Sequence, residues 1–295
     1  MTMTSRNTQN KKRLRIVLFL TSSYLVAEVI GGLITNSLAL LADAGHMFTD
    51  VAGLALALTA IWFAEKKATQ AKTYGYYRAE ILAAVINAIV LFGISFYILY
   101  EAWQRFKNPP QVESNTMLVV AVFGLVVNII GVLIMRKGSD ESLNMKGAYF
   151  EVLSDALSSV AVIIASLIMM FTGWYYADPI LSAIIGLFIL PRTWSLLKDG
   201  VNILLEGTPK DVNLAELRDI IKKVEGVKEV HDLHVWSLTS GMNAMSGHIV
   251  LADENTTSYN EMLQLLNTAI TSKFNIQHTT MQLEKVGFEE LEGHL

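Results

Sequence analysis

The sequence predicts a membrane α-helical bundle with six transmembrane helices, followed by a cytoplasmic α+β domain of the ferredoxin-like type. First, 52% of the 295 residues are hydrophobic, only 17% are charged, and the mean hydropathy is +0.40, which is too apolar for a soluble domain. Second, apolar segments of membrane-spanning length recur before residue 205. Third, the composition after that point is typical of a soluble domain.

Six apolar segments reach the length of about 20 residues that a bilayer core of about 30 Å requires. They lie at roughly 14–35, 38–64, 79–104, 115–136, 146–172 and 176–198. The short breaks at Asn36-Ser37 and around Gly173 predict tight helical hairpins. Asp178 stands just before Pro179 and is expected to cap the start of the sixth helix.

The C-terminal part reads as helix, strand, strand, helix, strand. A helical pattern over 210–226 ends at Gly226, and alternating segments at 227–238 and 243–252 predict two strands. A second helix is expected over 257–274 and a last strand over 278–286. The predicted organisation is therefore a cytoplasmic N-terminal tail (1–13), the transmembrane domain (14–204) and a cytoplasmic domain (205–295).

Basic residues indicate the orientation in the membrane. Lys and Arg gather before the first segment and after the second and fourth segments, whereas the opposite side has only Arg105 and Lys107. The positive-inside rule then places both termini in the cytoplasm. The chain has no cysteine, so disulfides and thiolate metal sites are excluded. The lack of a targeting segment and of cysteine fits a bacterial inner membrane, and the net charge of -4 gives no reason to expect nucleic acid as a partner.

Ionisable residues at helical spacing stand inside two of the apolar segments. His46 and Asp50 are four residues apart in the second segment, and Glu151 and Asp155 are four apart in the fifth. Each pair lies on one helix face. A charge at the centre of a bilayer costs about 2.5–3.5 kcal/mol, and these two segments contain no Lys or Arg at that depth. The carboxylates are therefore protonated, share a cation or face water, and each case indicates an ion pathway.

Four nitrogen and oxygen ligands that include an imidazole favour Zn²⁺ and its neighbours over Mg²⁺. Metal binding to such ligands releases protons, so the site has the chemistry of an antiporter. Asp43, one turn before His46, is a candidate extra ligand or a local hydrogen-bonding group. The alternatives are interhelical hydrogen bonds without a metal, or a non-metal ion carrier or channel in which the carboxylates act as a proton relay. A membrane metalloenzyme ranks lower because no HExxH motif, nucleophile elbow or phosphate loop is present.

The chain resembles the cation diffusion facilitator family of the zinc-transporter type over nearly its whole length. The stretches that carry the resemblance are NSLALLADAGHMFTDVAGL, YGYYRAEILAA, GAYFEVLSDALSSV, LLEGTP and HDLHVWSLTSG. The resemblance implies a homodimer that exchanges Zn²⁺ or a similar divalent ion for protons by alternating access. By position it implies a transport site of His46, Asp50, Glu151 and Asp155. Glu151 stands where zinc carriers usually have His, so Cd²⁺, Co²⁺, Fe²⁺ or Mn²⁺ are also candidate substrates.

The same resemblance implies a regulatory metal site in the cytoplasmic domain. Its expected ligands are His231, His248 and Glu284, with His234 and His278 as candidate additional ligands. The alternative is a strand with surface histidines. The resemblance also implies a salt bridge between Arg78 and Glu206 that holds the protomers together, whereas Arg78 could equally be a positive-inside flanking residue.

Overall fold

The computed structural model describes residues 3–64, 69–136, 143–239, 241–254, 257–274 and 276–288. Side chains are not described for residues 3–14, 50, 53–64, 143–148 and 277. By its internal contacts the chain forms two compact units. The first contains residues 1–58 and 86–197, and the second contains residues 59–85 and 198–295.

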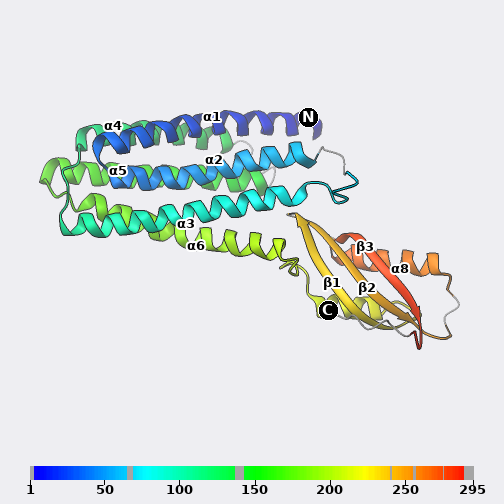
Figure 1. The fold of residues 1–295 in the computed structure, drawn as a ribbon. Coiled ribbons are helices and arrows are strands. Elements are labelled where there is room, and N and C mark those ends of the chain that lie inside the picture. The colour runs from blue at the N-terminus through cyan, green and yellow to red at the C-terminus, as the bar shows by residue number, and fades with distance from the viewer. Residues whose placement is uncertain are drawn as a thin grey trace. The chain divides into compact units, whose positions relative to one another are not determined.

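Six long helices follow one another in the first two thirds of the chain (Figure 1). They are α1 (Met3–Thr35), α2 (Leu38–Ala64), α3 (Tyr77–Lys107), α4 (Ser114–Arg136), α5 (Leu143–Thr172) and α6 (Ala177–Leu204). All six overlap the predicted segments. Among the described residues, five of them are long and apolar enough to cross a membrane, namely those in α1, α3, α4, α5 and α6. The protein is therefore a multi-pass membrane protein.

Two boundaries differ from the sequence-based expectation. The helix α1 already begins at Met3, so most of the expected N-terminal tail over 1–13 has helical backbone. Lys and Arg are good helix formers, and the basic cluster therefore continues the helix beyond the apolar span. The helix α6 continues through Gly200 to Leu204 rather than ending near 198, and it ends shortly before Gly207 and Pro209.

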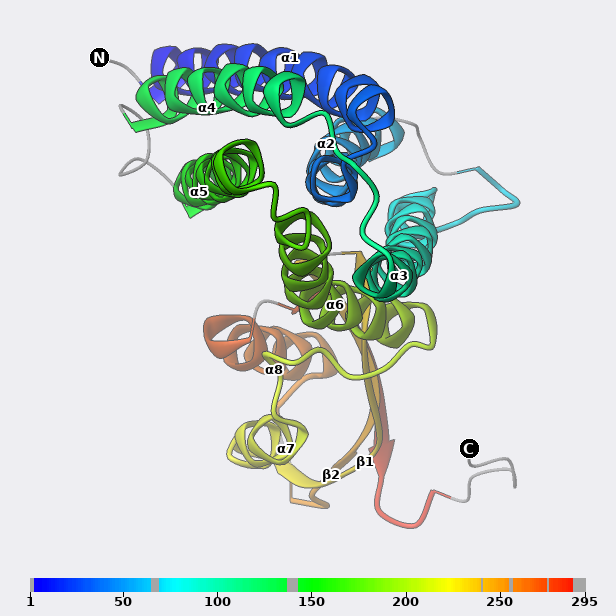
Figure 2. The ribbon, with the colours of Figure 1, turned by 90° about the vertical axis from the view of Figure 1, so that its left-hand side faces the viewer.

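Small residues allow close helix packing within the first unit. Figure 2 shows α4 lying along α1, and α5 also packs on α4. At the contact of α1 and α4, a Cβ atom on Gly124 would lie only 1.9 Å from the hydroxyl of Tyr24. Glycine at this position lets the buried Tyr24 ring approach the backbone of the neighbouring helix, as small residues do in other membrane bundles.

The cytoplasmic domain has the predicted element order. It consists of α7 (Leu214–Lys222), β1 (Val227–Thr239), β2 (Met242–Leu251), α8 (Tyr259–Lys273) and β3 (Ile276–Lys285). The sheet order is β1-β2-β3, with β1 and β2 antiparallel and β2 and β3 parallel. Asn213 caps the start of α7, and Ser258 caps α8 by accepting a hydrogen bond from the Glu261 amide.

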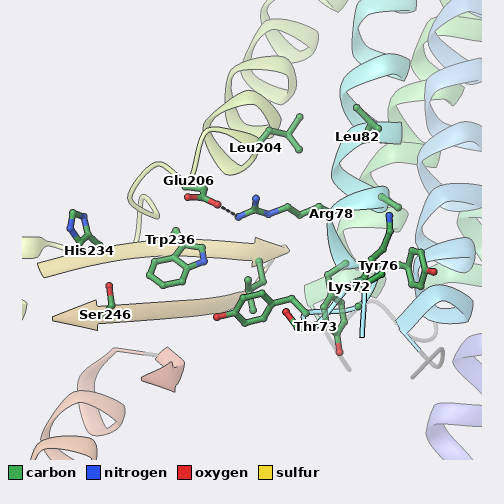
Figure 3. A pocket seen from close by; sticks show the side chains of 16 residues that line it. Lys72, Thr73, Tyr76, Arg78, Leu82, Leu204, Glu206, His234, Trp236 and Ser246 are labelled. Carbon is green, nitrogen blue, oxygen red and sulfur yellow. Dashed lines mark hydrogen bonds and ion pairs between the residues drawn. The ribbon is translucent and has the colours of Figure 1, made fainter. Parts of the chain in front are cut away.

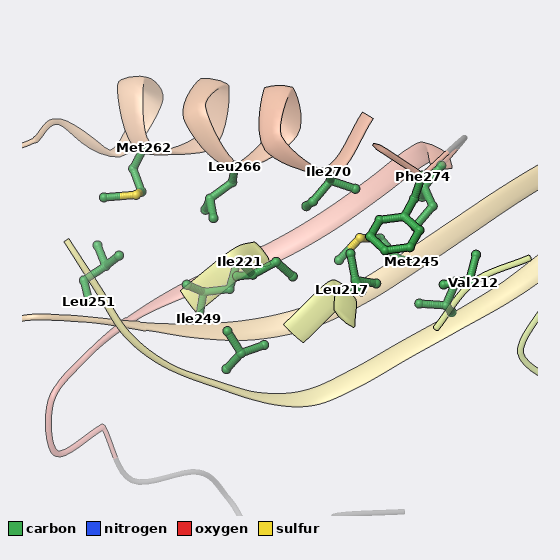
Figure 4. Close-up of a cluster of buried hydrophobic side chains, with 13 residues drawn as sticks. Val212, Leu217, Ile221, Met245, Ile249, Leu251, Met262, Leu266, Ile270 and Phe274 are labelled. Atoms are coloured by element: carbon green, nitrogen blue, oxygen red, sulfur yellow. The ribbon is translucent and has the colours of Figure 1, made fainter. Parts of the chain in front are cut away.

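The two short helices bury their apolar faces against the sheet. Figure 4 shows Leu217 and Ile221 of α7 together with Leu266 and Ile270 of α8 in this core. Ile249 contributes from β2 and is fully buried. Because strand side chains alternate between faces, the residues next to such core positions on the strands point to the other face of the sheet.

Candidate functional site

The structure brings together two of the four residues of the predicted intramembrane site, His46 and Asp155. The Nε2 atom of His46 in α2 lies 3.9 Å from Oδ1 of Asp155 in α5. Asp155 is only 3% exposed, and its Oδ1 atom has no hydrogen-bond partner among the described residues. Two ligands of a tetrahedral ion with bonds of about 2.1 Å lie about 3.4 Å apart. A cation could therefore bridge this pair with little movement.

Asp50 and Glu151 stand one helical turn from these two residues. The backbone of Asp50 lies in α2, but its side chain is outside the described part of the structure. Glu151 lies in α5, where its carboxylate accepts a hydrogen bond of 2.5 Å from the Arg192 guanidinium of α6. The expectation that no Lys or Arg reaches these carboxylates is therefore wrong. It considered only the second and fifth segments, whereas the cation comes from the sixth.

Asp43 belongs to a buried cluster of hydrogen-bonding side chains. It is 2% exposed, and its Oδ1 accepts a hydrogen bond of 2.6 Å from Ser158 of α5. Beside it lies Glu28 of α1, which is fully buried and accepts a hydrogen bond of 2.7 Å from the Tyr24 hydroxyl. Glu28 was not among the residues predicted from the sequence. The sequence does place the Glu28 carboxyl group inside an apolar segment, and such a position by itself suggests a functional residue.

Asp178 does not have the role that the sequence suggested. It lies within the first turn of α6, but its carboxylate accepts hydrogen bonds from Ser37 and from the amides of Leu38 and Ala39. It therefore caps α2 and not its own helix. A sequence pattern cannot reveal such a cap, because donor and acceptor are far apart along the chain.

The second predicted site is assembled on the sheet of the cytoplasmic domain. His231 and His248 are direct partners in the β1–β2 ladder, and Glu284 lies on the neighbouring strand β3. The Glu284 carboxylate is 3.1 Å from Nε2 of His231 and 3.0 Å from Nδ1 of His248. Ligand atoms of all three residues lie within 4.8 Å of one another. In the described part of the chain, this is the one group of three such residues close enough to hold a metal.

These distances suit a tetrahedral Zn²⁺ ion, whose ligand atoms lie about 3.4 Å apart. Glu284 is only 4% exposed, so a cation here would compensate a largely desolvated carboxylate. Val230 and Ile249, which precede His231 and follow His248, belong to the core under the helices. The histidines therefore point to the sheet face that α7 and α8 leave uncovered.

The structure separates the candidate additional ligands of this site. His234 pairs with Asp232 at 2.9 Å, and His278 lies opposite Ala244, four positions before His248 on β2. Asp232, which was not among the predicted ligands, approaches Nε2 of His248 to 3.8 Å. It lies at an irregularity in the ladder and has a φ of +48°. Such a bulge redirects a side chain in a way that strand alternation does not predict.

Arg78 and Glu206 form the predicted ion pair, at 2.8 Å. Both belong to the same chain and to the second compact unit, so the bond seen here is intramolecular. Figure 3 shows the pair beside a cavity of about 820 Å³, with Trp236 and His234 of β1 also on its wall. Residues of the segment from Ala71 to Ala79, which includes Arg78, also line this cavity.

Two family descriptions together match almost the whole chain. The description "Cation efflux transmembrane domain" matches residues 14–205, and "Cation efflux protein, cytoplasmic domain" matches residues 209–286. The first match ends at residue 205 and the second begins at residue 209.

Curated relatives are similar over most of their length. The chain is 50% identical to "Metal cation efflux system protein CzcD" of Cupriavidus metallidurans over 96% of this chain and 90% of the relative. It is 46% identical to "Cadmium, cobalt and zinc/H(+)-K(+) antiporter" of Bacillus subtilis, over 93% and 89%. It is 40% identical to "Zinc transporter ZitB" of Escherichia coli, over 93% and 88%. The chain therefore belongs to the cation efflux family, the cation diffusion facilitators.

Proposed function

We propose that this protein is a proton-coupled antiporter that exports divalent metal cations from the cytoplasm by alternating access, with Zn²⁺ as the principal substrate. The observation that carries the proposal is the buried carboxylate oxygen of Asp155, which has no hydrogen-bond partner among the described residues and lies 3.9 Å from the imidazole of His46. A desolvated anion next to an imidazole nitrogen is a site for a divalent cation. No covalent step is catalysed.

The proposed transport site consists of His46, Asp50, Glu151 and Asp155. Its single imidazole favours Zn²⁺, while three carboxylates also suit Cd²⁺, Co²⁺, Fe²⁺ or Mn²⁺. Proton coupling follows from the ligands themselves, because they bind metal only when deprotonated and must take up protons when the metal leaves. The name of the relative from Bacillus subtilis supports cadmium, cobalt and zinc as substrates and supports antiport, and that of the relative from Escherichia coli supports zinc.

The proposed cytoplasmic site holds a regulatory Zn²⁺ ion between His231, His248 and Glu284. Metal binding there would favour one conformation of the carrier and so couple the cytoplasmic metal concentration to transport. We further propose a division into a tail over 1–13, a six-helix membrane domain over 14–204 and a ferredoxin-like domain over 205–295. The working form is a homodimer in a bacterial inner membrane with both termini in the cytoplasm, and the match to the family's cytoplasmic domain supports dimerisation.

Metal flux into proteoliposomes with an imposed pH gradient tests this proposal. A panel of Zn²⁺, Cd²⁺, Co²⁺, Fe²⁺, Mn²⁺ and Mg²⁺ defines the substrate range. Asp155→Ala and Asp50→Ala should each abolish flux. Ser166→Ala is the matched control, because Ser166 is buried in the same helix as Asp155 and its hydroxyl donates to the carbonyl of Val162 one turn earlier. Unchanged flux in Asp155→Ala, or flux independent of the pH gradient, would contradict the proposal.

A further inference from the structure

Arg192 places a permanent positive charge beside a proposed metal ligand. Its Nη2 atom lies 2.5 Å from Oε1 of Glu151, which joins α6 to α5 within the first compact unit. The two side chains are 61% and 32% exposed in the isolated chain. The same guanidinium also acts electrostatically on His46 and Asp155. It therefore belongs to the surroundings of the intramembrane site.

The position of Arg192 in its helix is unusual. It stands directly after Pro191, which lies inside α6 and removes one hydrogen bond of the helix. Both residues fall in a segment that is apolar enough to cross a membrane. Arginine inside such a segment is costly and normally marks an ion pathway or pairs with a carboxylate. Arg192 does pair, and its partner is the carboxylate that a transported metal would need.

We propose that Arg192 is an internal counter-cation of the transport site, whose guanidinium competes with the divalent metal ion for the Glu151 carboxylate. The inference rests on the proposed transport role of Glu151. In the empty site Arg192 keeps Glu151 paired. In the loaded site the metal must displace the guanidinium or bind close to its charge. In either case Arg192 lowers the affinity for metal and speeds metal release.

The physical basis is the unequal effect of one fixed charge on two states. Leaving a charged carboxylate without a partner inside a membrane-spanning segment is unfavourable, and pairing with Arg192 lowers the free energy of the empty state. In the loaded state the same charge repels a divalent cation. Arginine cannot lose its proton in a protein, so this opposition persists at every pH at which the protein is folded. The fixed charge of Arg192 therefore lowers the free energy of the empty site relative to that of the loaded site.

Metal titration tests the proposal in a full-length parent protein that carries His231→Ala and His248→Ala to remove the cytoplasmic site. Arg192→Gln should lower the Kd for Zn²⁺ by roughly tenfold, because it removes the opposing charge. Arg192→Lys keeps a charge and should stay within about threefold of the parent. Lys198→Gln removes an exposed cation from the same helix and should leave the Kd unchanged. Thermal unfolding of each variant shows whether it is folded.

A double-mutant cycle separates competition for Glu151 from a general effect of charge or folding. In a Glu151→Gln background, adding Arg192→Gln should lower the Kd by clearly less than it does in the parent, since the contested carboxylate is gone and only the repulsion by the charge remains. In transport assays Arg192→Gln should lower both KM and kcat, because tighter binding slows release. A Kd that rises or stays constant in Arg192→Gln would overturn the proposal, and so would an equal effect in both backgrounds.

The same titration distinguishes this inference from the proposed function. A parent protein that binds no Zn²⁺ would overturn the transport site and, with it, the role of Arg192. A parent that binds Zn²⁺ normally, with the same Kd in Arg192→Gln, would overturn the role of Arg192 alone.

Discussion

The carboxylate of Asp178 in α6 accepts a hydrogen bond of 2.6 Å from the hydroxyl of Ser37, 141 residues earlier in the chain. It also accepts the amide hydrogens of Leu38 at 2.9 Å and Ala39 at 3.1 Å, and it is fully buried. A negative charge at this end of a helix is favourable because the first amides are otherwise unpaired. The start of α6 therefore holds the start of α2, the helix that carries His46.

Asp178→Ala should lower the free energy of unfolding by on the order of 3 kcal/mol, because it leaves three buried donors without an acceptor. Asp178→Asn keeps one carbonyl oxygen and should lose less. Thermal unfolding in detergent measures both, with Asp253→Ala as the control, since Asp253 is exposed in the cytoplasmic domain. Equal midpoints for Asp178→Ala and Asp253→Ala would show that the cap has no stabilising role.

Gly124→Ala should disturb the packing of α1 on α4, because the new Cβ atom would overlap the hydroxyl of Tyr24 at 1.9 Å. Tyr24 is buried and bonded to Glu28, so its ring has little freedom to move. We expect a loss of roughly 1–3 kcal/mol of stability, as for other overpacked sites. Gly93→Ala is the matched control, since a Cβ atom added to Gly93 would have no neighbour within 4 Å among the described residues. Similar thermal midpoints for the two variants would rule out this role for Gly124.

Glu151→His should narrow the range of transported ions. The change replaces a hard oxygen ligand by an imidazole, and imidazole prefers Zn²⁺ and Co²⁺ to Mn²⁺. The flux ratio of Zn²⁺ to Mn²⁺ in proteoliposomes should therefore rise above that of the unchanged protein. A ratio that stays the same, in a variant that still transports Zn²⁺, would mean that position 151 does not determine selectivity.

Metal binding to the cytoplasmic site should weaken as the pH falls, because histidine and carboxylate ligands bind metal only when deprotonated. In a full-length Asp155→Ala protein, His231→Ala should weaken the remaining Zn²⁺ binding by roughly tenfold or more. His278→Ala should have no effect, since this exposed residue lies opposite Ala244 and away from the cluster. Calorimetric titration at several pH values measures both effects. Equal losses in the two variants would contradict the assignment of ligands.

Much of the fold was predictable because membrane-spanning helices need long apolar segments and the bilayer sets their length. The same holds for the cytoplasmic domain, where alternation predicted the strands β1 and β2, while the register that sets His231 opposite His248 comes from the structure. The spacing of four residues within each of the pairs His46/Asp50 and Glu151/Asp155 also selected His46 and Asp155, which the structure places 3.9 Å apart. In these cases the spacing of side chains along a single helix or strand was sufficient for the prediction.

The residues that were missed act through packing between elements. Arg192 was not connected to Glu151 because the sequence does not reveal which face of α6 meets α5. Asp178 was assigned to its own helix because capping is usually local, whereas here the donors belong to α2. Asp232 reaches His248 only because β1 is irregular at that point. Such relationships depend on tertiary contacts and register.

The most direct test of the account is Zn²⁺ binding to full-length protein that carries His231→Ala and His248→Ala, with and without Asp155→Ala. We expect that the protein without the cytoplasmic histidines still binds Zn²⁺, that acid releases the metal, and that adding Asp155→Ala abolishes binding. If the protein bound no Zn²⁺ once the cytoplasmic histidines were removed, or if Asp155→Ala left binding unchanged, the intramembrane carboxylates would not form the transport site.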